Sequence, residues 1–208
     1  MIKVVFEDSD IMVVNKPPGL LVVPTPKNEK YTLTSILKLH PCHRLDRETS
    51  GLIVYAKKKD IQARMIEAFR ERRVKKRYLA LVQGFLSRPQ GLINKRIEGK
   101  EALTYYRVLE KRKEGFSIVE VSPITGRTNQ IRIHFKALGH PLVGERKFAF
   151  GKDFPLKFKR LALHAQYLEF NHPLSGKRLS FYAEMPEDMK NFLNQCTNIW
   201  KKTRQLQN

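Results

Sequence analysis

The sequence predicts an α+β fold built on a mostly antiparallel sheet. Two observations lead to this prediction. Short apolar segments separated by turn residues recur along the whole chain, and only a few segments have helical spacing. The 208 residues suffice for one domain with a substantial core, and no linker or internal repeat divides them. We therefore expect residues 1–208 to form a single domain.

The first part of the chain should alternate strands with two helices. We expect strands within residues 2–8, 10–19 and 20–24, separated by Asp and Pro-Pro-Gly turns. A short helix is predicted within 32–39, because Pro41 blocks its continuation, and a buried strand within 52–56. Ile61, Met65, Ala68 and Phe69 then form the apolar stripe of an amphipathic helix that opens at Asp60. A strand follows within 78–83.

The second part should contain two antiparallel strands within 101–122, joined by a turn at Glu114-Gly115. Residues 125–141 are ambiguous, because their apolar residues fit both a strand and a helix. Thr128 as a cap, Gly139 as a terminator and Pro141 beyond it favour the helix. Strands are expected within 160–170 and 178–186. A terminal helix then starts at Pro186, and the polar, basic tail from about residue 200 is expected to be disordered.

The charge is the most informative global property of the sequence. Forty Lys and Arg residues stand against twenty Asp and Glu residues, a formal net charge of +20. Adaptation to heat usually raises Lys and Glu together, which this composition does not show. A surface this basic indicates a polyanionic partner, and nucleic acid is the commonest one.

Several functional classes lack support. Two cysteines provide no disulfide framework, no apolar run approaches the ~20 residues of a membrane span, and the N-terminus has no signal-peptide layout, so we expect a cytoplasmic protein. His40, Cys42 and His43 cluster but lack a second ligand pair for zinc. No phosphate-binding Gly-rich loop occurs, and the basic segments are poor in the carboxylates that a metal-dependent nuclease requires.

Asp46 is the natural chemical candidate. It lies between Arg44 and Arg47 in "HRLDRETSGLIVYAK" (43–57), and this positive potential should keep its carboxylate ionised. An ionised Asp can act as a nucleophile or a base without a metal. It can equally be a cap or half of an ion pair, and the residues alone leave both open. The Thr49-Ser50-Gly51 segment is predicted to be a turn that places Asp46 at the sheet edge.

Other residues could support nucleic-acid binding. Basic residues greatly outnumber acids between positions 57 and 77, where they either track a phosphate backbone or form a solvated helix face. Tyr78 could be a core residue or could stack on a base. Arg127 and Arg132 offer planar forks for a phosphate or for a carboxylate such as Asp46.

Four strings, in order, resemble motifs of the RluA-type pseudouridine synthases. They are "NKPPGLLV" (15–22), "HRLDRETSGLIVYAK" (43–57), "RYLALVQG" (77–84) and "TGRTNQIRIHFKALGHPLVGE" (125–145). The resemblance implies the pseudouridine synthase fold, a mixed sheet flanked by helices with a central RNA-binding cleft. It also implies isomerisation of uridine to pseudouridine in structured RNA, ribosomal or transfer, by a monomer without cofactor or metal.

The resemblance assigns roles to individual residues. Asp46 matches the essential nucleophile, Tyr78 the tyrosine that packs on the target base, and Arg132 the arginine that pairs with the carboxylate. Arg44 matches the arginine that replaces the flipped-out nucleotide, and Ile131 lines the pocket. We expect His43, Arg47, Lys76 and Arg127 to contact RNA as well.

The sequence departs from the family pattern in two respects. Asn129 stands where the third motif commonly carries His. We also expect the catalytic domain to act without the N-terminal S4 module of many relatives, because the given sequence opens on the first strand of that domain. Two rival functions are an RNA-binding module without catalysis and a metal-dependent nuclease. The first would predict loss of Asp46, Tyr78 or Arg132, and all three are present.

Overall fold

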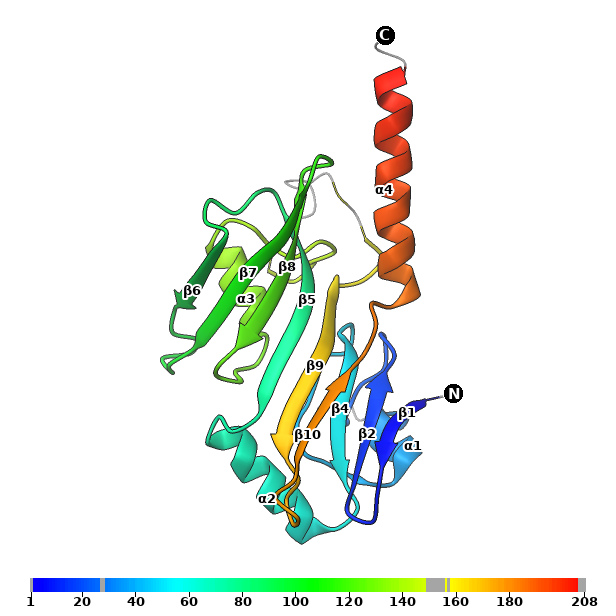
Figure 1. Ribbon diagram of the computed structural model, residues 1–208, viewed down its shortest axis with the longest axis vertical. Coiled ribbons are helices and arrows are strands. Elements are labelled where there is room, and N and C mark those ends of the chain that lie inside the picture. The colour runs from blue at the N-terminus through cyan, green and yellow to red at the C-terminus, as the bar shows by residue number, and fades with distance from the viewer. Residues whose placement is uncertain (1, 27–28, 149–155, 157, 206–208) are drawn as a thin grey trace.

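In the computed structural model, a ten-stranded sheet runs through the molecule (Figure 1). The structure describes residues 2–26, 29–148, 156 and 158–205, and within these it forms ten strands and four helices. The strands are β1 (Lys3–Glu7), β2 (Ile11–Lys16), β3 (His40–Pro41), β4 (Ser50–Ala56), β5 (Lys75–Gln83), β6 (Gln90–Asn94), β7 (Leu103–Arg112), β8 (Phe116–Pro123), β9 (Leu163–Asn171) and β10 (Arg178–Tyr182). The helices are α1 (Leu33–Leu37), α2 (Lys59–Arg70), α3 (Gln130–Ala137) and α4 (Glu187–Gln205).

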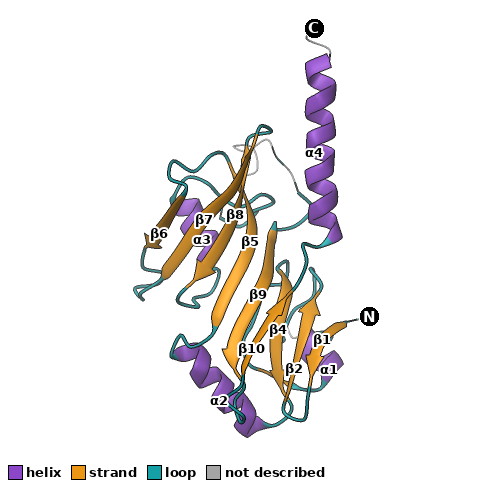
Figure 2. Cartoon of the chain, viewed as in Figure 1, coloured by secondary structure: helices purple, strands orange, loops and turns teal. Residues whose placement is uncertain are grey.

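The strand order is β1-β2-β4-β9-β5-β8-β7-β6, with β10 paired to β9 and β3 paired to β4. Every pairing is antiparallel except that of β4 with β9. The predicted α+β fold with a mostly antiparallel mixed sheet is therefore confirmed. Strand β9, which comes late in the sequence, lies between β4 and β5 and so joins the half of the sheet formed by β1, β2 and β4 to the half formed by β5, β6, β7 and β8 (Figure 2).

Strand β4 is buried on both faces, which explains why its sequence is apolar without alternation. One face packs with the buried stripe of α2, formed by Ile61 and Met65. The other packs with Leu33 of α1 and with Leu45. Leu45 directly precedes Asp46, so the core itself anchors the loop that carries the candidate carboxylate.

The structure corrects several expectations about secondary structure. Residues 20–24 form bends instead of a strand, because the carbonyl oxygens of Leu21 and Val22 accept the first backbone N–H groups of α1, from Leu33 and Thr34, at 2.8 and 3.0 Å. Strands β3 and β6 were not foreseen, being two and five residues long.

The ambiguous segment 125–141 forms helix α3, as the flanking residues predicted. Thr128 is not its cap; Asn129, in the left-handed region at φ 55°, is the residue before the first turn. Helix α4 continues to Gln205, so the prediction of disorder from about residue 200 is wrong up to that residue. Residues 206–208 lie outside the described part. None of the described helices is long and apolar enough to cross a membrane.

Candidate active site

A cavity of about 450 Å3 lies where the loop before β4, strand β5 and the segment leading into α3 meet. Among the predicted site residues, the structure brings eight to this cavity, and only Arg47 lies outside it. The eight are His43, Arg44, Asp46, Lys76, Tyr78, Arg127, Ile131 and Arg132. Side chains that are far apart in the sequence therefore share one concave surface.

Asp46 occupies the first position of a tight turn. The backbone N–H of Thr49 donates to the Asp46 carbonyl oxygen at 3.1 Å, and the Asp46 side chain is 25% exposed. The turn thus covers residues 46–49. The predicted Thr49-Ser50-Gly51 turn is wrong, because Ser50 and Gly51 already belong to β4, although the strand does follow Asp46 closely as expected.

Buried cations hold this turn from behind. The Lys16 ammonium is fully buried and donates to the carbonyl oxygens of Pro17, Leu20 and Arg47. The buried Arg160 guanidinium donates to the carbonyl oxygen of Glu48 at 3.1 Å. Because two of these acceptors, Arg47 and Glu48, directly follow Asp46 in the chain, the carboxylate is presented on a rigid backbone.

Arg132 projects from α3 toward Asp46. Its Nη1 lies 3.6 Å from Oδ2 of Asp46, an ion-pair distance that is too long for a hydrogen bond. Its Nε and Nη2 each donate to Glu145 at 2.7 Å, and Nη1 also donates to Oδ1 of Asn129 at 2.9 Å. Burial opposes the charge, but the paired hydrogen bonds to Glu145 outweigh it and raise the pKa of Arg132. The arginine is therefore a permanent cation beside Asp46.

Tyr78 lies on β5 and pairs along the backbone with Val121 of β8 and Ala165 of β9. Burial raises the pKa of its hydroxyl well above the ordinary value, and the Asp46 carboxylate adds to the effect. The phenol is thus protonated at physiological pH. Lys76, two residues earlier on the same strand face, lines the same cavity.

The basic residues of the cavity differ in whether their charged groups are free to contact a phosphate. Arg44 is exposed, and within the described residues no carboxylate pairs with Arg44 or Lys76. Burial lowers the pKa of Lys76 to about 8. Arg127 donates through Nε to the carbonyl oxygen of Glu101 at 3.0 Å, which orients its fork. Arg70 and Arg72, which belong to the basic segment 57–77 but were not singled out from the sequence, also line the cavity at and beyond the end of α2.

Two residues that were predicted to contact RNA, Arg47 and His43, have other surroundings than expected. Arg47 turns away from the cavity and pairs with Glu29 at 2.6 Å. His43 lines the cavity, but its Nε2 accepts from the Val54 backbone N–H at 3.1 Å and its ring packs on Phe69. Burial lowers the pKa of His43 to about 3, and the charge of Lys76 contributes. His43 is therefore neutral and offers RNA no positive charge.

The segment that carries Arg127 is shaped by a buried glutamine that sequence reasoning missed. The Gln130 carbonyl oxygen accepts from Thr125 and from the Arg127 backbone N–H, and its amide donates to Leu103 and Thr104. All four of its hydrogen-bonding positions in this buried site are satisfied. A Gln in the first turn of a predicted helix gave no signal of this role.

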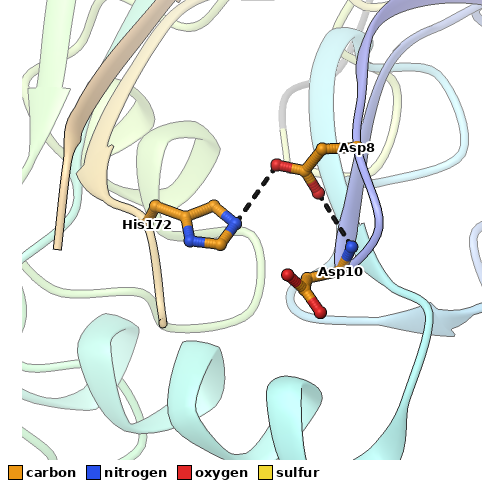
Figure 3. A group of neighbouring side chains, drawn as sticks. All are labelled: Asp8, Asp10 and His172. Carbon is orange, nitrogen blue, oxygen red and sulfur yellow. Dashed lines mark hydrogen bonds and ion pairs between the residues drawn. The ribbon is translucent and has the colours of Figure 1, made fainter. Parts of the chain in front are cut away.

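Asp8, Asp10 and His172 form the one cluster of potential metal ligands within the described residues (Figure 3). His172 Nε2 lies 3.2 Å from Oδ2 of Asp8. Its Nδ1 accepts the backbone N–H groups of Leu174 and Ser175, so the proton of the neutral ring is on Nε2, the atom that would bind a metal. The other oxygen of Asp8 accepts two backbone N–H groups. The cluster therefore fits a polar contact between the β1–β2 hairpin and the β9–β10 hairpin better than a metal site.

Comparisons with known proteins agree with one another. The family described as "RNA pseudouridylate synthase" matches residues 10–137. The "Dual-specificity RNA pseudouridine synthase RluA" of Yersinia pestis is 39% identical over 202 residues, covering 87% of this chain and 98% of the relative. The "Ribosomal large subunit pseudouridine synthase D" of Zymomonas mobilis is 35% identical over 225 residues, covering 91% and 71%.

Solved structures resemble this fold over most of its length. The "Human RNA Pseudouridylate Synthase Domain Containing 4" has a TM-score of 0.78 at 25% identity and covers 94% of this chain and 93% of its own. The "Human RNA Pseudouridylate Synthase Domain Containing 1" has a TM-score of 0.72 at 30% identity, covering 88% and 83%.

Proposed function

The chain belongs to the RluA-type RNA pseudouridylate synthase family, and we propose that Asp46, Tyr78 and Arg132 carry its chemistry. The enzyme isomerises uridine to pseudouridine in RNA. In this reaction the bond between N1 of the base and the sugar breaks, the base turns, and C5 forms the new bond and loses its proton. The single observation that carries the proposal is the 3.6 Å contact between Arg132 and Asp46 inside the cavity.

Asp46 is the nucleophile of this proposal. Its carboxylate lies in the cavity next to a permanent cation, and a carboxylate can act as a nucleophile without a metal. Attack on the sugar carbon, addition to the base and formation of a glycal intermediate all use the same ionised carboxylate. Tyr78 faces the cavity as a protonated phenol, so its ring can pack on the target base and its hydroxyl can take part in proton transfer.

The target uridine must leave its stack to enter the cavity, which costs a few kcal/mol. Arg44 is exposed at the rim, where it can take the place of the extruded nucleotide. Lys76 and Arg127 supply positive charge for the distorted backbone, and Ile131 forms an apolar part of the wall. His43 shapes the wall as a neutral ring. Arg47 is excluded from direct contact in this proposal because it pairs with Glu29.

The substrate of this proposal is ribosomal or transfer RNA, since one relative is named for the large ribosomal subunit and others for dual specificity. The proposal also assigns residues 1–208 to one catalytic domain that acts as a monomer in the cytoplasm. Its free cysteines, Cys42 and Cys196, are compatible with a reducing compartment.

The test is tritium release from ribosomal and transfer RNA labelled at uridine C5, because the label leaves as the new carbon–carbon bond forms. Wild type should release tritium from one of these RNAs, and Asp46→Asn should release none while keeping its RNA affinity. Asp60→Asn, at an exposed carboxylate on α2, is the matched control and should behave as wild type. Full release by Asp46→Asn would contradict the nucleophile assignment. Binding without release by wild type would favour an RNA-binding module.

A further inference from the structure

Arg132 is shared between two carboxylates, and the sharing is unequal. Glu145 accepts two hydrogen bonds of 2.7 Å from Nε and Nη2, whereas Asp46 lies 3.6 Å from Nη1. An arginine fork that grips one carboxylate through two donors has its strongest interaction there. The candidate nucleophile thus receives the weaker contact of the two.

The side chain of Glu145 is more deeply buried than that of Asp46. Its side chain is 1% exposed, against 25% for Asp46. Its Oε1 also accepts the backbone N–H groups of Lys147 and Phe148 at 2.8 and 3.2 Å. Burial alone would raise the pKa of Glu145, but the hydrogen bonds from Arg132 and these backbone groups lower it. The carboxylate is therefore charged and immobile.

The backbone before Glu145 fixes its place. Gly144 has φ +81° and lies so close to the backbone of Arg160 that a Cβ there would overlap the Arg160 carbonyl oxygen. Arg160 in turn holds the carbonyl oxygen of Glu48 in the turn of Asp46. Arg160 therefore contacts both the segment of Glu145 and the turn of Asp46. These contacts fix the position of Arg132 relative to Asp46.

We infer that Glu145, together with Asn129, is a positioning residue that fixes the Arg132 fork and offsets its charge. Arg132 can then orient Asp46 without holding it in a two-donor contact. The inference rests on the proposed nucleophilic role of Asp46. A carboxylate held by a full bidentate fork would have to break two charge-assisted hydrogen bonds before attacking. Glu145 occupies those two donors, and Asn129 holds Nη1 by its side-chain oxygen at 2.9 Å.

The other charged and titratable groups that face Asp46 do not depend on Glu145. They are Lys16 on β2 and Tyr78 on β5, which interact electrostatically with Asp46, and Arg44 at the cavity rim. Removing the charge of Glu145 therefore changes the field at Asp46 both directly and by leaving the charge of Arg132 uncompensated, and both effects have the same sign. This makes the pH dependence of turnover a direct readout of the proposed role.

The experiment compares kcat, KM for RNA and the pH profile of wild type, Glu145→Gln and Glu145→Asp. In Glu145→Gln, kcat should fall about 100-fold, the cost of misplacing a catalytic group by about 1 Å, while KM changes little. The acid limb of the kcat profile should move to lower pH, because an uncompensated arginine then faces the attacking carboxylate. Glu145→Asp should recover part of kcat and return the limb toward the wild-type position.

The matched control is Glu169→Gln, another mostly buried carboxylate that accepts from an arginine, Arg178, but lies outside the cavity. It should keep the wild-type kcat and acid limb. A folded Glu145→Gln enzyme with wild-type kcat would overturn the inference, and so would a loss of activity with an unmoved acid limb, which is what a purely structural role predicts. An inactive wild type would instead contradict the proposed function.

Discussion

The ammonium group of Lys16 donates a 3.1 Å hydrogen bond to the carbonyl oxygen of Arg47, the residue that follows Asp46. Lys16 belongs to the opening strand-and-turn segment, so this bond connects the "NKPPG" turn with the turn of Asp46. The backbone N–H of Gly19 donates to the same carbonyl oxygen at 2.8 Å. Two segments that sequence reasoning treated as separate motifs therefore form one unit behind the cavity.

Lys16→Met should destabilise the protein and lower its activity. The substitution removes a donor from three partly buried carbonyl oxygens; that of Arg47 keeps its bond from Gly19, whereas those of Pro17 and Leu20 lose this donor. An acceptor left unsatisfied in a buried site costs about 1–3 kcal/mol, so we expect the free energy of unfolding, measured by urea denaturation, to fall by about 2 kcal/mol or more. Lys3→Met, at an exposed residue on β1, should change it by less than about 0.5 kcal/mol. Equal stabilities would show that the buried ammonium has no structural role.

Arg132→Lys should impair turnover much more than RNA binding. A lysine ammonium cannot reproduce the two-donor contact with Glu145 while also facing Asp46. We expect kcat to fall about 100-fold with KM nearly unchanged in steady-state assays on the responsive RNA. Arg127→Lys should show the opposite pattern, a raised KM with kcat largely kept. A raised KM as the main effect of Arg132→Lys would reassign this arginine to binding.

RNA affinity should fall as pH rises above 8. Burial lowers the pKa of Lys76 to about 8, so its ammonium is charged below that pH and loses its proton above it. A phosphate favours the charged form, so binding and protonation are coupled and affinity decreases once the free side chain is neutral. Filter binding from pH 7 to 9.5 should show this decrease for wild type and a flatter curve for Lys76→Arg. Superimposable curves would exclude Lys76 from phosphate contact.

RNA affinity should depend steeply on salt concentration. The slope of this dependence should respond differently to substitution of Arg44 and of Arg47. Each phosphate contact contributes about 0.7–0.9 to the slope of log affinity against log salt concentration. Arg44→Gln should reduce the slope by about that amount, because Arg44 lines the cavity. Arg47→Gln should leave the slope unchanged, because Arg47 pairs with Glu29 outside the cavity. A larger loss for Arg47→Gln would restore the role that the sequence suggested.

Gly51→Ala should prevent stable folding. Gly51 has φ +118°, and a Cβ there would lie 2.6 Å from the backbone nitrogen of Ala165 and nearer still to its carbonyl oxygen. Both partners are backbone in the parallel contact between β4 and β9, so neither can move without opening the sheet. Soluble expression and thermal melting should show a severe loss. Gly99→Ala has comparable backbone strain at φ +72° but open space at its Cβ position, so it should lose only a few degrees.

Much of the fold follows from local patterns in the sequence. The apolar run before Lys57 predicted a buried strand, and the stripe from Ile61 to Phe69 predicted α2, because burial leaves a pattern of apolar residues in the sequence. Residues 20–24 misled the same reasoning. Leu21 and Val22 are buried as in a strand, but their carbonyl oxygens accept the first backbone N–H groups of α1 instead of joining the sheet.

The candidate site, like the fold, could be predicted only in part from the sequence. Asp46, Tyr78 and Arg132 could be named from the residues and the motifs they belong to. Their meeting in one cavity could not be derived, because it depends on how β9 joins the two halves of the sheet. The exclusion of Arg47 also required the structure, since only the fold brings Glu29 within 2.6 Å of it.

The sequence by itself determined the basic surface, the α+β class and the three residues proposed for catalysis. Only the tertiary structure decided which groups orient them: Lys16 behind the turn, Gln130 beneath Arg127, and Glu145 on the Arg132 fork. The physical reason is the range of each interaction. Apolar burial is recorded in the spacing of adjacent residues, whereas a buried polar contact depends on distance and orientation between segments that meet only after the sheet has formed.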